Sequence, residues 1–167
     1  MRLASACLTA ILLCAAAPAS AQTAKLVKTF DDWQVFVHEA NNEKVCFAAS
    51  APKESTPKGA SRGSIFFYLT TWAKDGVKNE VSVKIGYTFK PESTPTLKIG
   101  SEKFELYPKE DKAFMRDPAD ERKLVDAMRK GSSLELAGQS SRGTSTEDKY
   151  SLRGLSAALK HVDEVCP

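Results

Sequence analysis

Residues Gly59-Ala60-Ser61-Arg62-Gly63 match the G-x-S-x-G pattern that surrounds the nucleophilic serine of many hydrolases. In those enzymes the serine lies on a strained turn between a strand and a helix, and an acid and a histidine follow later in the chain. Here the pattern lies in a polar loop and leads into a strongly β-forming segment, and His161 is the only histidine after it. We therefore interpret it as a flexible Gly/Ser loop and predict no catalytic residue.

His38 and His161 are the two imidazoles of the chain, and neither belongs to a spacing such as H-x-x-E-H that is typical of zinc sites. The acidic residues between Glu110 and Glu121 lack the Asp-x-Asp-x-Asp-Gly order of a calcium loop. Those that begin an expected helix, Asp120 and Glu121, are explained by the helix macrodipole. We predict no metal site and no other cofactor.

Arginine next to glycine recurs in the loops of this chain, as in Arg62-Gly63 and Arg142-Gly143. A loop arginine of this kind can approach a phosphate or carboxylate closely. Arg62 and Arg142 are therefore weak candidates for ligand contacts, and ordinary loop solubility with glycine turns is the preferred explanation for them. The net charge of +3, from 24 basic and 21 acidic residues, is too small an excess to indicate nucleic-acid binding.

Residues 1–21 have the organisation of a secretory signal peptide. A positive start at Arg2 precedes an apolar run that is shorter than a bilayer-spanning helix, and Ala19-Ser20-Ala21 has the small-residue pattern of a cleavage site. The remaining residues, 22–167, are expected to form a single domain without a transmembrane anchor. The sequence thus predicts export beyond the inner membrane of a bacterial host.

Cys46 and Cys166 are the cysteines that remain after residue 21. An even pair in an exported protein indicates one disulfide, which would join the second expected strand to the C-terminus. Two buried free thiols are the alternative. A redox role is disfavoured because the chain has no Cys-x-x-Cys spacing to lower a thiol pKa.

The elements that must position these residues are mostly short strands. The aromatic and β-branched segment 65–72 is the strongest of them and is expected at the centre of a sheet. Its aromatic residues could form a ligand platform, but within a single apolar strand such residues more often fill a core; they are Phe66, Phe67, Tyr68 and Trp72. Helices are expected from Asp117 to Gly131 and from Leu155 to Val165. The other strands are expected at residues 33–38, 44–50, 79–87, 96–99, 104–107, 113–115, 133–137 and 149–153. Many short strands with turns between them, and only two helices, predict an all-β antiparallel sandwich.

The sequence is similar to proteins of the invasion-associated locus B (IalB) family over nearly all of residues 22–167. The segments that carry this resemblance, in chain order, are Phe30-Asp31-Asp32-Trp33, Val45–Lys53, Asn79–Val83, Lys103–Leu106, Met128–Ser133, Ser141–Thr144, Asp148–Leu152 and Leu155–Leu159 with a cysteine near the end of the chain. The resemblance implies an exported alphaproteobacterial protein with an immunoglobulin-like β-sandwich. It supplies no agreed catalytic residues.

These observations favour a non-enzymatic binding or interaction protein that stays in the periplasm, associates with the outer membrane or is secreted. Its partner would be an envelope or host-surface protein or ligand, as for proteins associated with host-cell invasion. The alternatives are an unrecognised periplasmic hydrolase that uses carboxylates and loop arginines, and a structural protein of the envelope.

Overall fold

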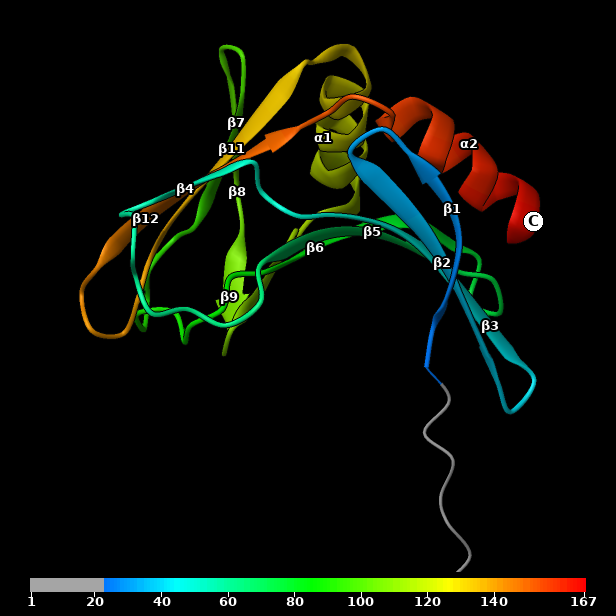
Figure 1. The fold of residues 1–167 in the computed structure, drawn as a ribbon, viewed down its shortest axis with the longest axis horizontal. Helices are drawn as coiled ribbons and strands as arrows, with labels where there is room; N and C mark the ends of the chain where they lie inside the picture. Colours follow the sequence, from blue (N-terminus) through cyan, green and yellow to red (C-terminus); the bar gives the residue numbers. More distant parts are fainter. Residues whose placement is uncertain (1–22) are drawn as a thin grey trace, which may run out of the picture.

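The computed structural model describes residues 23–167 as two antiparallel sheets and two helices (Figure 1). The segment expected to be a signal peptide, residues 1–21, lies outside the described residues. One sheet has seven strands, in the order β1 (Lys25–Phe30), β2 (Trp33–Ala40), β3 (Glu43–Ser50), β5 (Phe66–Trp72), β6 (Val77–Lys84), β10 (Lys112–Phe114) and β9 (Tyr107–Lys109). The other has five, in the order β4 (Glu54–Thr56), β12 (Ser145–Ser151), β11 (Ser133–Gln139), β7 (Thr96–Ile99) and β8 (Glu102–Glu105).

The two sheets form an open sandwich whose core lies between their facing sides. Side chains alternate across a pleated strand, so β2 buries Trp33 and Val35 completely while Gln34 points to solvent. Leu134, Leu136 and Tyr150 are fully buried on the second sheet. This arrangement is the predicted all-β, immunoglobulin-like antiparallel sandwich with two helices.

The helices close the sandwich at one end. Helix α1 (Pro118–Lys130) contacts β6 of the first sheet and β8 of the second, and α2 (Leu155–Val165) lies against β1, β2 and β3 (Figure 1). Leu124 and Met128 of α1 and Leu159 of α2 are fully buried. Neither helix in residues 23–167 is long and apolar enough to cross a membrane.

Helix α1 begins and ends where the sequence predicts. The side chain of Asp117 accepts hydrogen bonds from the backbone N–H groups of Ala119 (2.6 Å) and Asp120 (3.3 Å). Pro118 occupies the first turn, where a missing N–H is harmless, and Gly131 caps the C-terminus. Helix α2 also spans the predicted residues, Leu155–Val165.

Cys46 of β3 and Cys166, which directly follows α2, form the expected disulfide. Their Cα atoms are 6.1 Å apart, and both side chains are fully buried. The bond fastens α2 to the sheet on which it packs, because Cys166 extends the apolar face of that helix. The C-terminus is therefore tied covalently to a strand formed about 120 residues earlier.

Some strand predictions were incomplete or displaced. Strands β1 and β4 were missed because both are mostly solvent-exposed and show no alternation of apolar residues. The last strand is Ser145–Ser151 rather than residues 149–153, because its inward positions include Thr146 and Asp148 and therefore do not look apolar. Strand β6 ends at Lys84 instead of continuing to residue 87, and Gly86 follows with a positive φ of 79°.

Candidate functional site

A groove lies between α1 and the edge of β6. It has a volume of about 590 Å³, which is in the range of small-ligand sites. Apolar side chains contribute to its lining, together with charged groups from both walls. The lining residues are Val77–Val81 from β6, Tyr107, Phe114–Pro118 from the segment that enters α1, and Glu121, Arg122, Val125, Asp126 and Arg129 from α1 itself.

One wall of the groove is a stretch of strand edge. Strand β10 pairs with β6 only from Ser82 to Lys84, so no strand in residues 23–167 covers the β6 edge from Val77 to Val81. Asn79 interrupts this stretch with a positive φ of 58°, a conformation that asparagine tolerates better than most residues. Its Oδ1 atom is buried and accepts no hydrogen bond from the described residues.

Glu121 reaches from α1 across the groove to this edge. Its Oε1 atom accepts a hydrogen bond from the backbone N–H of Val81 at 2.7 Å. Burial raises the pKa of the Glu121 carboxyl, the Val81 hydrogen bond opposes the rise, and the charge of Glu80 adds to it. A carboxyl with a raised pKa in a groove is the kind of group that binding sites and acid–base catalysts share.

Four cations line the groove, namely Lys78, Arg116, Arg122 and Arg129. Within residues 23–167, no carboxylate lies within 4.0 Å of any of their charged groups. The guanidinium of Arg116 instead stacks 5.2 Å above the ring of Tyr107. These side chains are free to meet an anionic group on a ligand.

Two of the carboxylates that line the groove already accept hydrogen bonds from backbone N–H groups. Asp117 caps α1 and Glu121 holds the Val81 N–H, which leaves Glu80 and Asp126 as the other carboxylates of the groove. The groove therefore offers more uncommitted cationic side chains than anionic ones. Asp117 and Glu121 keep their charge, so the lining carries four cations and four carboxylates, and it is the cations without ion-pair partners among the described residues that can meet a negatively charged group of a ligand.

Arg62, one of the two candidate ligand contacts, is held inside the sandwich. Its Nη1 and Nη2 atoms bind the carboxylate of Asp148 at 2.8 and 2.6 Å, and Nε and Nη2 also donate to the carbonyl of Ile85. The side chains of Arg62 and Asp148 are only 6% and 0% exposed. The structure thus gives Arg62 a contact that joins the loop before β5 to the second sheet, and leaves its guanidinium little access to a ligand.

Arg142 lies in the exposed turn between β11 and β12, outside the groove lining. The structure does not bring Arg62 and Arg142 together into the lining of the α1–β6 groove. It also does not include His38, in β2, or His161, in α2, in that lining. His161 instead contacts Glu164 at 3.1 Å.

The G-x-S-x-G segment joins β4 to β5 and has no helix after it. Its last glycine, Gly63, donates a backbone hydrogen bond to the carbonyl of Gly86 at 2.8 Å. A Cβ atom on Gly86 would lie 2.5 Å from the Gly63 carbonyl oxygen, so the two backbones can approach only because residue 86 is glycine. In residues 23–167, no group of three or more His, Cys, Asp or Glu side chains is placed to hold a metal ion.

The aromatic residues of β5 divide between the two faces of the sheet. Phe67 is fully buried in the core, whereas Phe66 and Tyr68 are half-buried and Trp72 is 38% exposed on the outer face. Phe36 and Phe47 stack beside them with ring centres 5.1 Å apart. The core interpretation therefore holds for Phe67, while Phe66, Tyr68 and Trp72 lie on the other face because side chains alternate across the strand. A ligand platform on that face stays a prediction.

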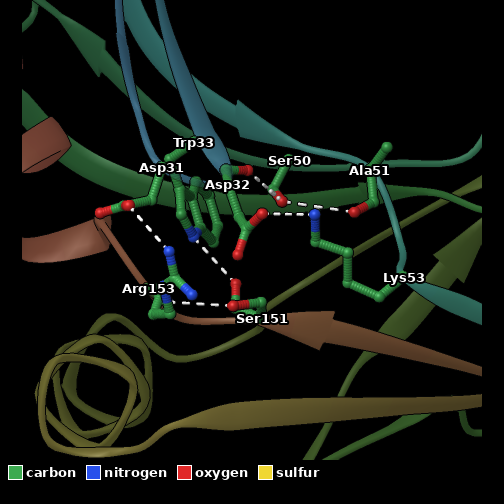
Figure 2. Close-up of polar contacts among 8 residues, drawn as sticks. All are labelled: Asp31, Asp32, Trp33, Ser50, Ala51, Lys53, Ser151 and Arg153. Carbon is green, nitrogen blue, oxygen red and sulfur yellow. Dashed lines mark hydrogen bonds and ion pairs between the residues drawn. The ribbon is translucent and has the colours of Figure 1, made fainter.

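The motif Phe30-Asp31-Asp32-Trp33 forms a structural junction between the two sheets (Figure 2). The indole N–H of Trp33 donates to the carbonyl of Ser151 at 3.0 Å. Asp32 forms an ion pair with Lys53, and the Lys53 hydrogen bond, followed by that of Ser151, lowers the pKa of the Asp32 carboxyl. These contacts fasten the turn between β1 and β2 to the end of β12.

An exposed ion pair completes the same junction. The guanidinium of Arg153 lies 3.0 Å from the carboxylate of Asp31, while its backbone N–H donates to the Ser151 hydroxyl (Figure 2). Ser50 contributes from the end of β3, where its hydroxyl donates to the carbonyl of Asp32 at 2.7 Å. The residues of this motif, which carry part of the family resemblance, therefore make structural contacts between the two sheets.

The fold defines the class of protein: a two-sheet, immunoglobulin-like antiparallel sandwich, with a groove between α1 and the open edge of β6. Residues 27–166 match the family described as "Protein of unknown function (DUF1176)", and the chain belongs to this family. No curated protein matches the chain.

The fold is similar to the crystal structure of invasion associated protein B from Bartonella henselae, with a TM-score of 0.59. The two chains are 20% identical, and the alignment covers 84% of this chain and 97% of that one. The resemblance to invasion-associated locus B proteins is thus confirmed, and at this identity it defines the fold.

The groove residues were not identified from the sequence. Glu121 was explained as an acid that complements the helix macrodipole, and its raised pKa depends on burial against β6, which is 40 residues away in the chain. The open edge of β6 has no local signal at all. A charged helix face that repeats Glu121, Arg122, Val125 and Arg129 at helical spacing was the one available indication.

Proposed function

We propose that this protein is an exported, non-enzymatic binding module of the bacterial envelope, and that it holds its ligand in the groove between α1 and β6. The observation that carries the proposal is the groove itself, in which cationic side chains without ion-pair partners among the described residues surround a half-apolar hollow of about 590 Å³. The buried disulfide supports export, because such bonds persist in oxidising compartments.

The same disulfide and the signal-like residues 1–21 support a periplasmic location, with outer-membrane association or secretion as alternatives. The partner is an envelope or host-surface protein or ligand. The name of the Bartonella protein associates that relative with invasion, and a role in host-cell entry is a narrower form of the proposal. Fractionation of cells that express the tagged protein tests the location directly.

The binding proposal is tested by retention of material from periplasmic and outer-membrane extracts on the immobilised protein. The groove variant is Arg122→Glu/Arg129→Glu, and its matched control is Arg142→Glu/Lys160→Glu, which makes the same change of charge at two exposed residues outside the groove. We expect the wild type and the control to retain a common ligand and the groove variant to lose it. Equal retention by all three proteins, with circular dichroism showing them folded, would contradict the proposal.

A hydrolase remains the second candidate because the carboxyl of Glu121, with its raised pKa, lies in the groove. A set of chromogenic esters, amides, glycosides and phosphates provides the assay. Turnover that is present in the wild type and absent from Glu121→Gln would favour the enzyme over the binding module.

A further inference from the structure

We propose that the groove binds an extended, acidic peptide segment of a partner protein, which pairs as an added strand with the open edge of β6. This inference rests on the proposed function, because it names the ligand of the same groove. Its basis is the combination of an unpaired strand edge, a facing helix and cationic side chains without partners among the described residues.

The backbone of β6 provides the template. Strand β10 ends at Phe114, which pairs with Ser82, and the chain then turns through residues 115–117 into α1. The edge from Val77 to Val81 continues beyond that point without a neighbouring strand among the described residues. Such an edge is the surface on which extended peptides add to a sheet through main-chain hydrogen bonds.

Glu121 already occupies one position of this edge. Its carboxylate accepts the Val81 N–H at 2.7 Å, in the direction in which a neighbouring strand would place a carbonyl oxygen. The hydrogen bond satisfies a backbone donor of the open strand edge that would otherwise lack a protein acceptor. An incoming strand either replaces this acceptor or continues the pairing next to it.

Helix α1 forms the opposite wall and supplies the charge. Arg122 and Arg129 are seven residues apart, which places them two turns, or about 10 Å, apart along the helix. This separation corresponds to roughly three residues of an extended strand. Arg116, stacked on Tyr107, adds a third cation at the end of the groove where the chain enters α1. Acidic side chains on the added strand would meet these groups, while apolar ones would contact Val125 and Val77.

The experiment uses an array of decapeptides in which Glu alternates with Val, Ile, Thr or Tyr, and a second array with Lys in place of Glu. Binding to the full mature protein is measured by fluorescence polarisation at low salt. We expect members of the Glu array to bind at least about tenfold more tightly than their Lys counterparts. The groove variant Arg122→Glu/Arg129→Glu should lose this binding, and Arg142→Glu/Lys160→Glu should retain it.

Strand addition is distinguished from simple charge attraction by N-methylation of the best peptide. Alternate N–H groups of a strand point to opposite sides, so one set of N-methyl groups blocks pairing with β6 and the other set faces away. We expect an affinity loss of about tenfold or more for one set only, because several main-chain hydrogen bonds are removed. Amide hydrogen exchange along the β6 edge from Val77 to Val81 should also slow when the unmodified peptide is bound.

The inference is overturned if no member of the Glu array binds, or if both N-methylated sets bind as well as the parent peptide. Retention of an extract ligand that depends on Arg122 and Arg129 would then still support the groove as a binding site for another ligand. If no peptide bound and the groove variant also retained the same extract material as the wild type, the proposed function would be overturned as well.

Discussion

Arg62 and Asp148 form a buried, two-pronged ion pair between the loop that precedes β5 and strand β12, with N–O distances of 2.8 and 2.6 Å. Arg62 also donates to the Ile85 carbonyl, and its guanidinium lies over the ring of Tyr87. The carboxylate, the carbonyl and the ring together compensate for the burial of the Arg62 charge. The pair connects the two sheets at a position where the sandwich would otherwise bury apolar residues. Its value to the fold depends on both partners being present.

Removal of one partner should destabilise the protein strongly. We expect Arg62→Met or Asp148→Leu alone to cost about 3–5 kcal/mol of unfolding free energy, because each leaves an unpaired charge in the core. The double variant Arg62→Met/Asp148→Leu should recover most of that loss. Urea unfolding of the four proteins in a double-mutant cycle measures the coupling. Additive effects of the two substitutions would show that the pair is not coupled.

Glu121 should make the protein more stable as the pH falls. Its pKa is raised in the folded state above the ordinary value of 4.5, so the folded protein binds the proton more tightly than the unfolded chain. Stability therefore falls as the pH rises from 4.5 through the folded-state pKa. Glu121→Gln keeps an acceptor for Val81 and should be more stable than the wild type at pH 7–8.

The comparison of wild type with Glu121→Gln by thermal unfolding at several pH values checks this prediction. The difference should shrink as the pH falls and disappear below pH 4.5, where the Glu121 carboxyl is protonated in both the folded and the unfolded wild type. A Gln variant that is less stable than the wild type at pH 7–8 would mean that the carboxylate is stabilising, against the prediction.

Asp32 should have the opposite pH dependence. Lys53 lowers its pKa below the ordinary value of 3.8, so the contribution of the pair is fully present above that value and is lost as the pH falls through the folded-state pKa. We expect Lys53→Met to reduce stability at pH 7 by up to about 1 kcal/mol, because Lys53 is half-exposed. Chemical unfolding at pH 7 and at pH 2.5 should show the difference only at the higher pH.

Loss of the Cys46–Cys166 disulfide should destabilise the end of the sandwich where α2 packs. The substitution Cys46→Ala/Cys166→Ala is expected to cost about 2–5 kcal/mol, as for native disulfides that close long loops. Urea unfolding with and without a reductant measures the effect, and the double variant serves as its own control because it should not respond to the reductant. Mass spectrometry of the non-reduced protein should find both cysteines in one linked peptide.

Both helices and the central position of β5 could be predicted from the sequence, because each depends on local information. The pairing of Cys46 with Cys166 could be predicted because they are the two cysteines that remain after residue 21. The N-cap Asp117, the C-cap Gly131 and the apolar repeat of α2 are contained within one or two turns of chain. Strand β12 was displaced because its inward Asp148 is a charge, and only the distant Arg62 makes burial of that charge possible. Strands β1 and β4 were missed because an exposed edge strand has no apolar pattern.

The sequence by itself therefore determined the fold class, the pairing of Cys46 with Cys166 and the bounds of both helices, since hydrophobic periodicity, capping residues and cysteine count are properties of the chain. Only the tertiary structure decided that Arg62 is buried, that β6 keeps an open edge and that Glu121 reaches across to it. The physical reason is that burial, strand register and the pKa of a carboxyl depend on neighbours brought together from distant parts of the chain. The groove is formed by β6 and α1, which are distant in the chain, so local sequence patterns could not predict it.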